Sequence, residues 1–173
     1  MKKLSCVLMV FASVIVFLGC SDKKAMTREE KIEEFQSLLT ASDTTQMLQL
    51  CDNAMEQLKG KMVDEVLASL YEYDDSLKEL KPLSEEMRNR MQRQFQMFPV
   101  LDYECQYYSF MLEGCNDVKY KITFATAEQT GGEPATTMFM FNPVKVGDEW
   151  KLCVKTQDKE IDQAKQLELH KDL

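Results

Sequence analysis

Apolar side chains recur at helical spacing through the first half of the chain, beyond residue 26. Thr27 and Glu30 have the spacing of a capping box, which predicts the start of a helix. That helix would carry its apolar side chains on one face, at Ile32, Phe35, Leu38 and Leu39. A second capping box is predicted at Asp43 and Gln46. The most regular stripe in the chain follows it, at Met47, Leu50, Cys51, Ala54, Met55 and Leu58.

Two further helices are expected between Gly60 and Pro99. The first would place apolar side chains at Met62, Val63, Val66, Leu67, Leu70 and Tyr71. The second begins after Ser84, whose hydroxyl can accept a hydrogen bond from a backbone N–H of the first turn. Its apolar face would hold Met87, Met91, Phe95 and Phe98. We interpret the charged residues 74–82 as a connection between these helices.

After Pro99 the pattern changes to alternation, which indicates strands over 100–112, 118–124, 137–146 and 150–154. The first strand changes phase after Tyr107, so we expect a β-bulge near that residue. The third is apolar on both faces and would be central or covered, with a kink at Pro143. Helices followed by an antiparallel meander predict an α+β fold. The N-terminal helices would pack on one face of a curved antiparallel sheet of four or slightly more strands.

The N-terminus has the layout of a secretory signal: Lys2 and Lys3, a largely apolar stretch to Gly19, and Cys20. Its end resembles a bacterial lipobox, in which the Cys20 thiol takes a diacylglyceryl group, although Phe17 stands where leucine is usual. An uncleaved transmembrane anchor is the alternative, but the apolar stretch is short for one. The expected organisation is a signal peptide over 1–19, a lipidated tether over 20–26, one domain over 27–156 and a charged tail over 157–173.

Ser21 does not resemble the aspartate that retains some lipoproteins at the inner membrane. The expected location is therefore the outer membrane, on its periplasmic side or at the cell surface. The formal net charge of −8 argues against nucleic acid and against an anionic membrane surface as electrostatic partners. The single histidine, His170, excludes most histidine-based catalysis. Neighbouring acidic pairs lack the loop spacing of a calcium site, so we expect no metal. The sequence also has no nucleotide-binding glycine loop, and we expect no cofactor.

Two stretches carry a family resemblance. Residues 47–70 resemble early helices arranged around a glycine, and 144–152, with the sequence VKVGDEWKL, resembles a terminal hairpin. Their order is similar to that of the nuclear transport factor 2-like (cystatin-like) superfamily, and especially to small lipoproteins of Bacteroidetes, over about Thr44 to Lys155. The resemblance implies a cone-shaped sheet with a helix-lined pocket. It implies no single function, because members include isomerases, dehydratases, polyketide cyclases and binding modules.

The inward candidates for such a pocket are Met91, Phe95, Asp102, Tyr103 and Tyr107. An aspartate beside a tyrosine resembles the general base and oxyanion donor of ketosteroid isomerase relatives. Ordinary sheet aromatics are the simpler interpretation of the tyrosines. The many methionines on expected core faces would either fill the core or line an adaptable pocket for an apolar ligand.

The cysteines beyond Cys20 are Cys51, Cys105, Cys115 and Cys153. An even number in an exported protein permits two disulfides, whose pairing the sequence leaves open. For Cys51, a buried thiol on a helix stripe is the simpler alternative. The absence of a CxxC pair gives no support to a thioredoxin-like or zinc-ribbon site.

Three functions remain compatible with the sequence. The first, which we favour because catalytic residue types are scarce, is a non-catalytic binding or interaction module anchored in the cell envelope, with another envelope protein as its partner. The second is a binder of a small apolar ligand in a Met- and aromatic-lined pocket between helices and sheet. The third is a small isomerase- or cyclase-type enzyme that uses the same pocket.

Overall fold

The computed structural model of the protein describes residues 26–74 and 76–155. The expected signal peptide, Cys20, most of the tether and the charged tail lie outside the described residues. None of the helices within these ranges is long and apolar enough to cross a membrane.

The helices begin where short polar side chains cap them. The capping box of Thr27 and Glu30 is confirmed, with Thr27 N donating to Glu30 Oε2 at 2.7 Å. Ser84 caps its helix by accepting from Met87 N at 3.3 Å. The second box differs from the prediction: Thr40 is the N-cap and Asp43 is its partner. The helices are α1 (Arg28–Ser37), α2 (Ala41–Lys59), α3 (Val63–Ser69), α4 (Glu85–Met97) and α5 (Ala127–Thr130).

Six strands form one curved sheet in the order β2-β1-β6-β5-β4-β3. All neighbours are antiparallel except β1 and β6, which run parallel with Leu70 opposite Leu152. The fold is therefore α+β with a curved sheet, as predicted. The sheet has six strands, where four or slightly more were expected, and it is mixed instead of wholly antiparallel. The strands are β1 (Leu70–Asp74), β2 (Glu79–Pro82), β3 (Asp102–Leu112), β4 (Cys115–Ala125), β5 (Ala135–Val146) and β6 (Glu149–Val154).

The prediction for residues 70–82 was wrong. Leu70 and Tyr71 were expected to continue a helix, and 74–82 to form a connection. They instead form the β1–β2 hairpin, with Tyr73 opposite Leu80. The helix α3 ends at Ser69, because Leu70 adopts an extended backbone conformation and joins the sheet beside β6.

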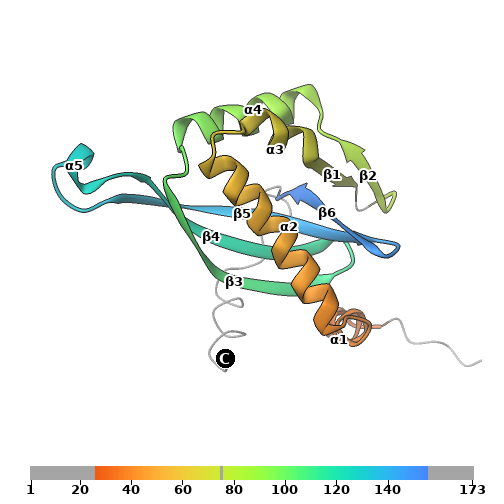
Figure 1. Ribbon diagram of the computed structural model, residues 1–173. Helices are drawn as coiled ribbons and strands as arrows, with labels where there is room; N and C mark the ends of the chain where they lie inside the picture. Colours follow the sequence, from red (N-terminus) through yellow and green to blue (C-terminus); the bar gives the residue numbers. More distant parts are fainter. Residues whose placement is uncertain (1–25, 75, 156–173) are drawn as a thin grey trace, which may run out of the picture.

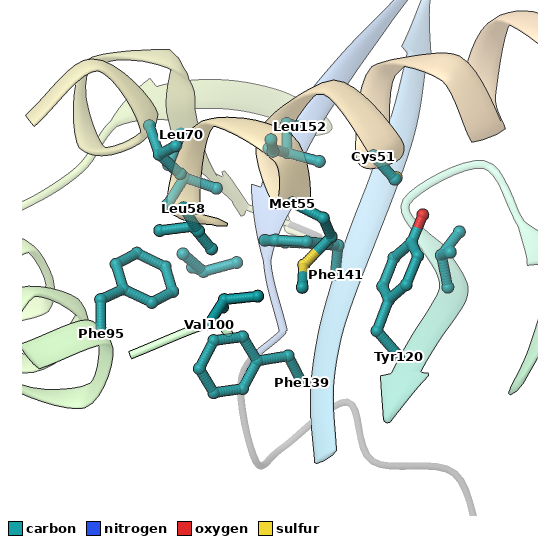
Figure 2. Close-up of a cluster of buried hydrophobic side chains, with 14 of the residues drawn as sticks. Cys51, Met55, Leu58, Leu70, Phe95, Val100, Tyr120, Phe139, Phe141 and Leu152 are labelled. Atoms are coloured by element: carbon teal, nitrogen blue, oxygen red, sulfur yellow. The ribbon is translucent and has the colours of Figure 1, made fainter. Parts of the chain in front are cut away.

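The helices α2, α3 and α4 lie over one face of the sheet, and α2 crosses it diagonally (Figure 1). The main core fills the space between them. Met47 and Met55 of α2 and Tyr120 and Ile122 of β4 are fully buried. Figure 2 shows Phe95 of α4 and Phe139 of β5 turned toward the same interior. Burial of these side chains supplies the main stabilisation of the layer arrangement.

Two irregularities set which side chains face the helices. The register of β3 against β4 shifts between Cys105 and Tyr107, which confirms the expected bulge. In β5, pairing with β4 extends to Phe141 and pairing with β6 starts at the same residue. The strand therefore passes from one partner to the other just before Pro143, where a kink was expected, and its central position is also as predicted.

A second, smaller cluster lies on the sheet face away from α2. It is formed by Tyr73, Val144 and Cys153, all buried. Where β4 and β5 part, two buried asparagines satisfy the backbone groups: Asn116 Nδ2 donates to the Pro143 carbonyl at 2.9 Å, and Asn142 Nδ2 donates to the Gly114 carbonyl at 2.9 Å. These side-chain hydrogen bonds replace the backbone hydrogen bonds between β4 and β5 that are absent beyond Val118 and Phe141.

Candidate functional site

The five residues expected to line one pocket are not brought together. Phe95 is 3% exposed and packs against Phe139 with ring centroids 5.6 Å apart, and Met91 packs against the same core. Tyr103 faces the helices, whereas Tyr107 lies on the opposite face beside Lys119, because the bulge between them reverses the alternation. The expectation of a shared pocket is therefore corrected: its apolar members are core residues.

A row of polar pairs joins α2 to β3 and β4 and is called here the α2–β3 seam. Asp52, Glu56 and Lys59 stand at positions i, i+4 and i+7 of α2, and so share one face of the helix. The hydroxyl of Tyr120 donates to Asp52 Oδ1 at 2.6 Å, and that of Tyr103 donates to Glu56 Oε1 at 2.7 Å. The ammonium of Lys59 contacts Asp102 Oδ1 at 3.1 Å. These are the seam's six residues.

The seam's tyrosines are held in their neutral form. Burial, and then the hydrogen bond to a carboxylate, raises the pKa of both Tyr103 and Tyr120 far above the ordinary value. The Lys59 ammonium lowers the pKa of Asp102. The hydroxyl groups of Tyr120 and Tyr103 therefore already donate their protons in hydrogen bonds to Asp52 and Glu56. The carboxyl group of Asp102 stays ionised at neutral pH. A general base needs a pKa near the working pH, and neither shift leads there.

The four cysteines form no disulfide with one another in the described part of the chain. Cys51 and Cys153 are buried, Cys105 is exposed, and Cys115 lies 3.7 Å from the Lys155 ammonium. Burial raises the pKa of the Cys51 thiol strongly. Partial loss of solvent around its sulfur also raises the pKa of Cys105, although the residue as a whole is exposed. Both are therefore neutral thiols at physiological pH, which makes them slow nucleophiles.

Among the clefts that the described residues form on the surface, two are open and have well-defined linings. The first, of about 340 Å³, is at the end of β3, β4 and β5 near α5. Its lining is polar and consists of Asp102, Tyr103, Glu104, Lys121, Thr123, Glu133, Pro134 and Thr136. Within residues 26–74 and 76–155, no three His, Cys, Asp or Glu side chains are arranged to hold a metal ion.

The second cleft, of about 310 Å³, lies between α2 and the β5–β6 hairpin and is called here the amide groove. It is lined by Gln46, Gln49, Leu50, Asn53, Asp148, Glu149 and Trp150. Asp43 lies beside its floor, where it accepts from Trp150 Nε1 at 3.4 Å and pairs with Lys145 at 2.5 Å. The Lys145 ammonium, with the hydrogen bonds from Thr40, holds the pKa of Asp43 far below its usual range.

Sequence reasoning missed Asp52 and Glu56 of the seam and the amides of the groove. A signal for both was present, because each set repeats at helical spacing on α2, one on either side of its apolar stripe. The helical pattern does not indicate which strand each set of side chains packs against. That depends on the sheet order, which places β6 and β3 on different sides of β4 and β5.

Comparison with known proteins adds little to this geometry. No protein-family model matches the chain. No curated protein matches it either. Among solved structures, the chain is similar to a Campylobacter jejuni protein described as a candidate nuclear transport factor 2-like transpeptidase. The identity is 13% and the TM-score 0.36, over 62% of this chain and 96% of the other.

Proposed function

We propose that this chain is an exported lipoprotein, anchored in the outer membrane through Cys20, whose α+β domain is a non-catalytic binding or interaction module. The observation that supports this most is the packing between α4 and the sheet. Phe95, 3% exposed, and Phe139 occupy the space in which an enzyme or an apolar-ligand binder of this architecture would hold its ligand (Figure 2). This packing supports recognition at the surface of the domain, and we propose another envelope protein or an envelope component as the partner.

The polar chemistry of the seam supports the same proposal. Its tyrosines donate to carboxylates of α2, and its aspartate is paired with Lys59. An enzyme of the isomerase or cyclase type would need an acid or base whose pKa is shifted toward neutrality inside an apolar site. The shifts of Tyr103, Tyr120 and Asp102 all lead away from neutrality. The resemblance of residues 44–155 to nuclear transport factor 2-like domains is compatible with a binding role.

The test of the domain's role measures binding of an apolar probe, 1-anilinonaphthalene-8-sulfonate, by its fluorescence. The wild type is expected to give no saturable binding at neutral pH, because the interior is filled. Phe95→Ala removes a ring from that interior and is expected to create binding. Saturable binding by the wild type that Phe95→Trp abolishes would contradict the proposal and favour the apolar-ligand alternative.

The test of the anchor replaces the expected lipid-bearing cysteine. Cys20→Ser is expected to remove the acyl mass from the purified protein and to move it from the membrane fraction to the soluble fraction. Cys6→Ser, a change within the expected signal peptide, is the matched control and should leave both properties unchanged. A Cys20→Ser protein that keeps its acyl mass would exclude this attachment site.

A further inference from the structure

We infer that the amide groove binds a short, uncharged saccharide. This inference rests on the proposed role of the domain as a binding module, and it adds the surface and the class of ligand. The groove runs along α2 and faces the turn of the β5–β6 hairpin. Its residues belong to elements that the fold holds together, since α2 packs directly on β6.

One wall of the groove carries amides. Gln46, Gln49 and Asn53 follow one another at i, i+3 and i+7 of α2, and all three are exposed. Gln46 donates to Ser42 at 3.0 Å, but among the described residues the side chains of Gln49 and Asn53 have no hydrogen-bond partner. Each amide offers a donor and an acceptor side by side, and neighbouring sugar hydroxyls also both donate and accept. The wall therefore matches the hydrogen-bonding pattern of a polyhydroxyl ligand.

The floor of the groove is apolar and fixed. Leu50 and the edge of Trp150 that remains accessible, 7% of the residue, supply it, and Trp150 is held from below by two contacts. Its Nε1 donates to Asp43 at 3.4 Å, and its ring lies 5.6 Å from that of Phe110. A sugar ring presents C–H groups on its faces and hydroxyls at its rim, so it needs an apolar floor with polar walls. A floor that is already ordered loses little entropy when a ligand binds.

The opposite wall selects against negative charge. Asp148 and Glu149 stand at the hairpin turn, exposed, where Gly147 adopts a φ of 61°. The Glu149 carboxylate is paired with the Lys151 ammonium at 2.6 Å, so Asp148 carries the free negative charge of this wall. A carboxylate accepts hydrogen bonds from hydroxyls and repels anions such as phosphates and uronic acids. The volume of about 310 Å³ holds about ten water molecules, which limits the bound part to one or two sugar rings. The ligand class that fits is thus small, neutral and rich in hydroxyls.

The experiment uses the fact that Trp150 is the chain's single tryptophan. The full chain is purified in a detergent without a sugar headgroup, and its tryptophan fluorescence is titrated with maltotriose, cellotriose and tri-N-acetylchitotriose. At least one of these is expected to give a saturable change. The double variant Gln49→Ala/Asn53→Ala should weaken that binding at least tenfold. The matched control Asn89→Ala/Gln96→Ala removes two exposed amides from α4 and should leave it unchanged.

Three results would overturn the inference. The first is no fluorescence change with any of the three sugars. The second is equal weakening by the control variant, which would locate binding outside the groove. The third is a response to trialanine amide and not to the sugars, which would assign the groove to an extended peptide. None of these results bears on the Cys20 anchor or on the filled interior, because those are tested by acyl mass and by an apolar probe. Failure of the saccharide inference can therefore be distinguished from failure of the proposed function.

Discussion

The ring of Tyr73 occupies the place where a side chain on Gly114 would begin. A β-carbon built on Gly114 would lie 1.8 Å from Tyr73 Cε1 and 2.4 Å from Cδ1. Tyr73 comes from β1 and Gly114 from the turn between β3 and β4, so the contact joins segments that are separated in the sheet by β6 and β5. The glycine is required at this position for space, since its φ is not positive.

Replacing Gly114 with alanine is expected to destabilise the protein by about 1–3 kcal/mol, because the buried Tyr73 ring must move out of its packing position. The urea midpoint of unfolding measures this. Gly132→Ala is the matched control, since a β-carbon there meets nothing within 4 Å, and it should change the midpoint little. A Gly114→Ala protein as stable as the control would show that Tyr73 can be displaced at no cost.

Loss of the Asp43 carboxylate is expected to destabilise the native state at neutral pH. Asp43 is 6% exposed and contacts Thr40, Lys145 and Trp150. Asp43→Asn keeps the shape but removes the charge that Lys145 faces, and should cost about 1–3 kcal/mol. Asp148→Asn, an exposed aspartate in the neighbouring turn, is the control and should cost almost nothing.

The pH dependence of the same pair gives a second readout. The pKa of Asp43 in the folded state lies far below the unfolded value of about 3.9. Its stabilisation is therefore complete above the unfolded pKa and is lost as the pH falls toward the folded pKa. The stability difference between wild type and Asp43→Asn should shrink when unfolding is measured at pH 3 instead of pH 7. A difference that stays constant would contradict this interpretation.

Removing the Tyr120 hydroxyl is expected to leave the half-buried Asp52 carboxylate without its 2.6 Å partner. Tyr120→Phe should cost about 1–2 kcal/mol. Because the folded pKa of Tyr120 is raised, its contribution is complete below the unfolded value of about 10 and is lost as the pH rises above it. The variant should therefore show a smaller loss of stability between pH 9 and pH 11 than the wild type, as followed by circular dichroism.

The contributions of Lys155 and Asp117 to the free energy of unfolding are expected to depend strongly on each other, because the two side chains form a buried ion pair. Its side chains are 4% and 0% exposed, so removal of either leaves a buried charge facing an uncharged group. Lys155→Met and Asp117→Asn should each cost about 3–5 kcal/mol, and the double variant should cost much less than their sum. Additive costs in this double-mutant cycle would mean that the two charges are stabilised independently.

The sequence predicted the elements that local chemistry determines. Short polar side chains followed by helical apolar periodicity identified the starts at Thr27 and Ser84 correctly. The start of α2 was misplaced by three residues, because both Thr40 and Asp43 are good caps and the choice depends on their mutual hydrogen bonds. Leu38, expected on an apolar face, is 71% exposed, since α1 ends at Ser37.

The hairpin of β1 and β2 could not be predicted from local pattern. Helical spacing continues without a break through Val66, Leu67, Leu70 and Tyr71. A pattern of only four apolar residues is compatible with a helix and with a strand alike. The strand is selected over the helix by the parallel pairing of Leu70 with Leu152, which is distant in the sequence. The candidate pocket failed for a related reason: the bulge in β3 was foreseen, but the face of the sheet on which Tyr107 would lie required knowledge of the partner register.

The parallel pairing of β1 with β6 also constrains the order in which the chain acquires its structure. The contact of Leu70 with Leu152 closes a loop of more than eighty residues. Closing so long a loop costs entropy that only the finished sheet repays, which slows folding. During synthesis, α2 can form early, but the β1–β2 hairpin has no further strand to pair with until β6 has emerged. A chain cut short before Glu149 would therefore lose the hairpin along with its last strand.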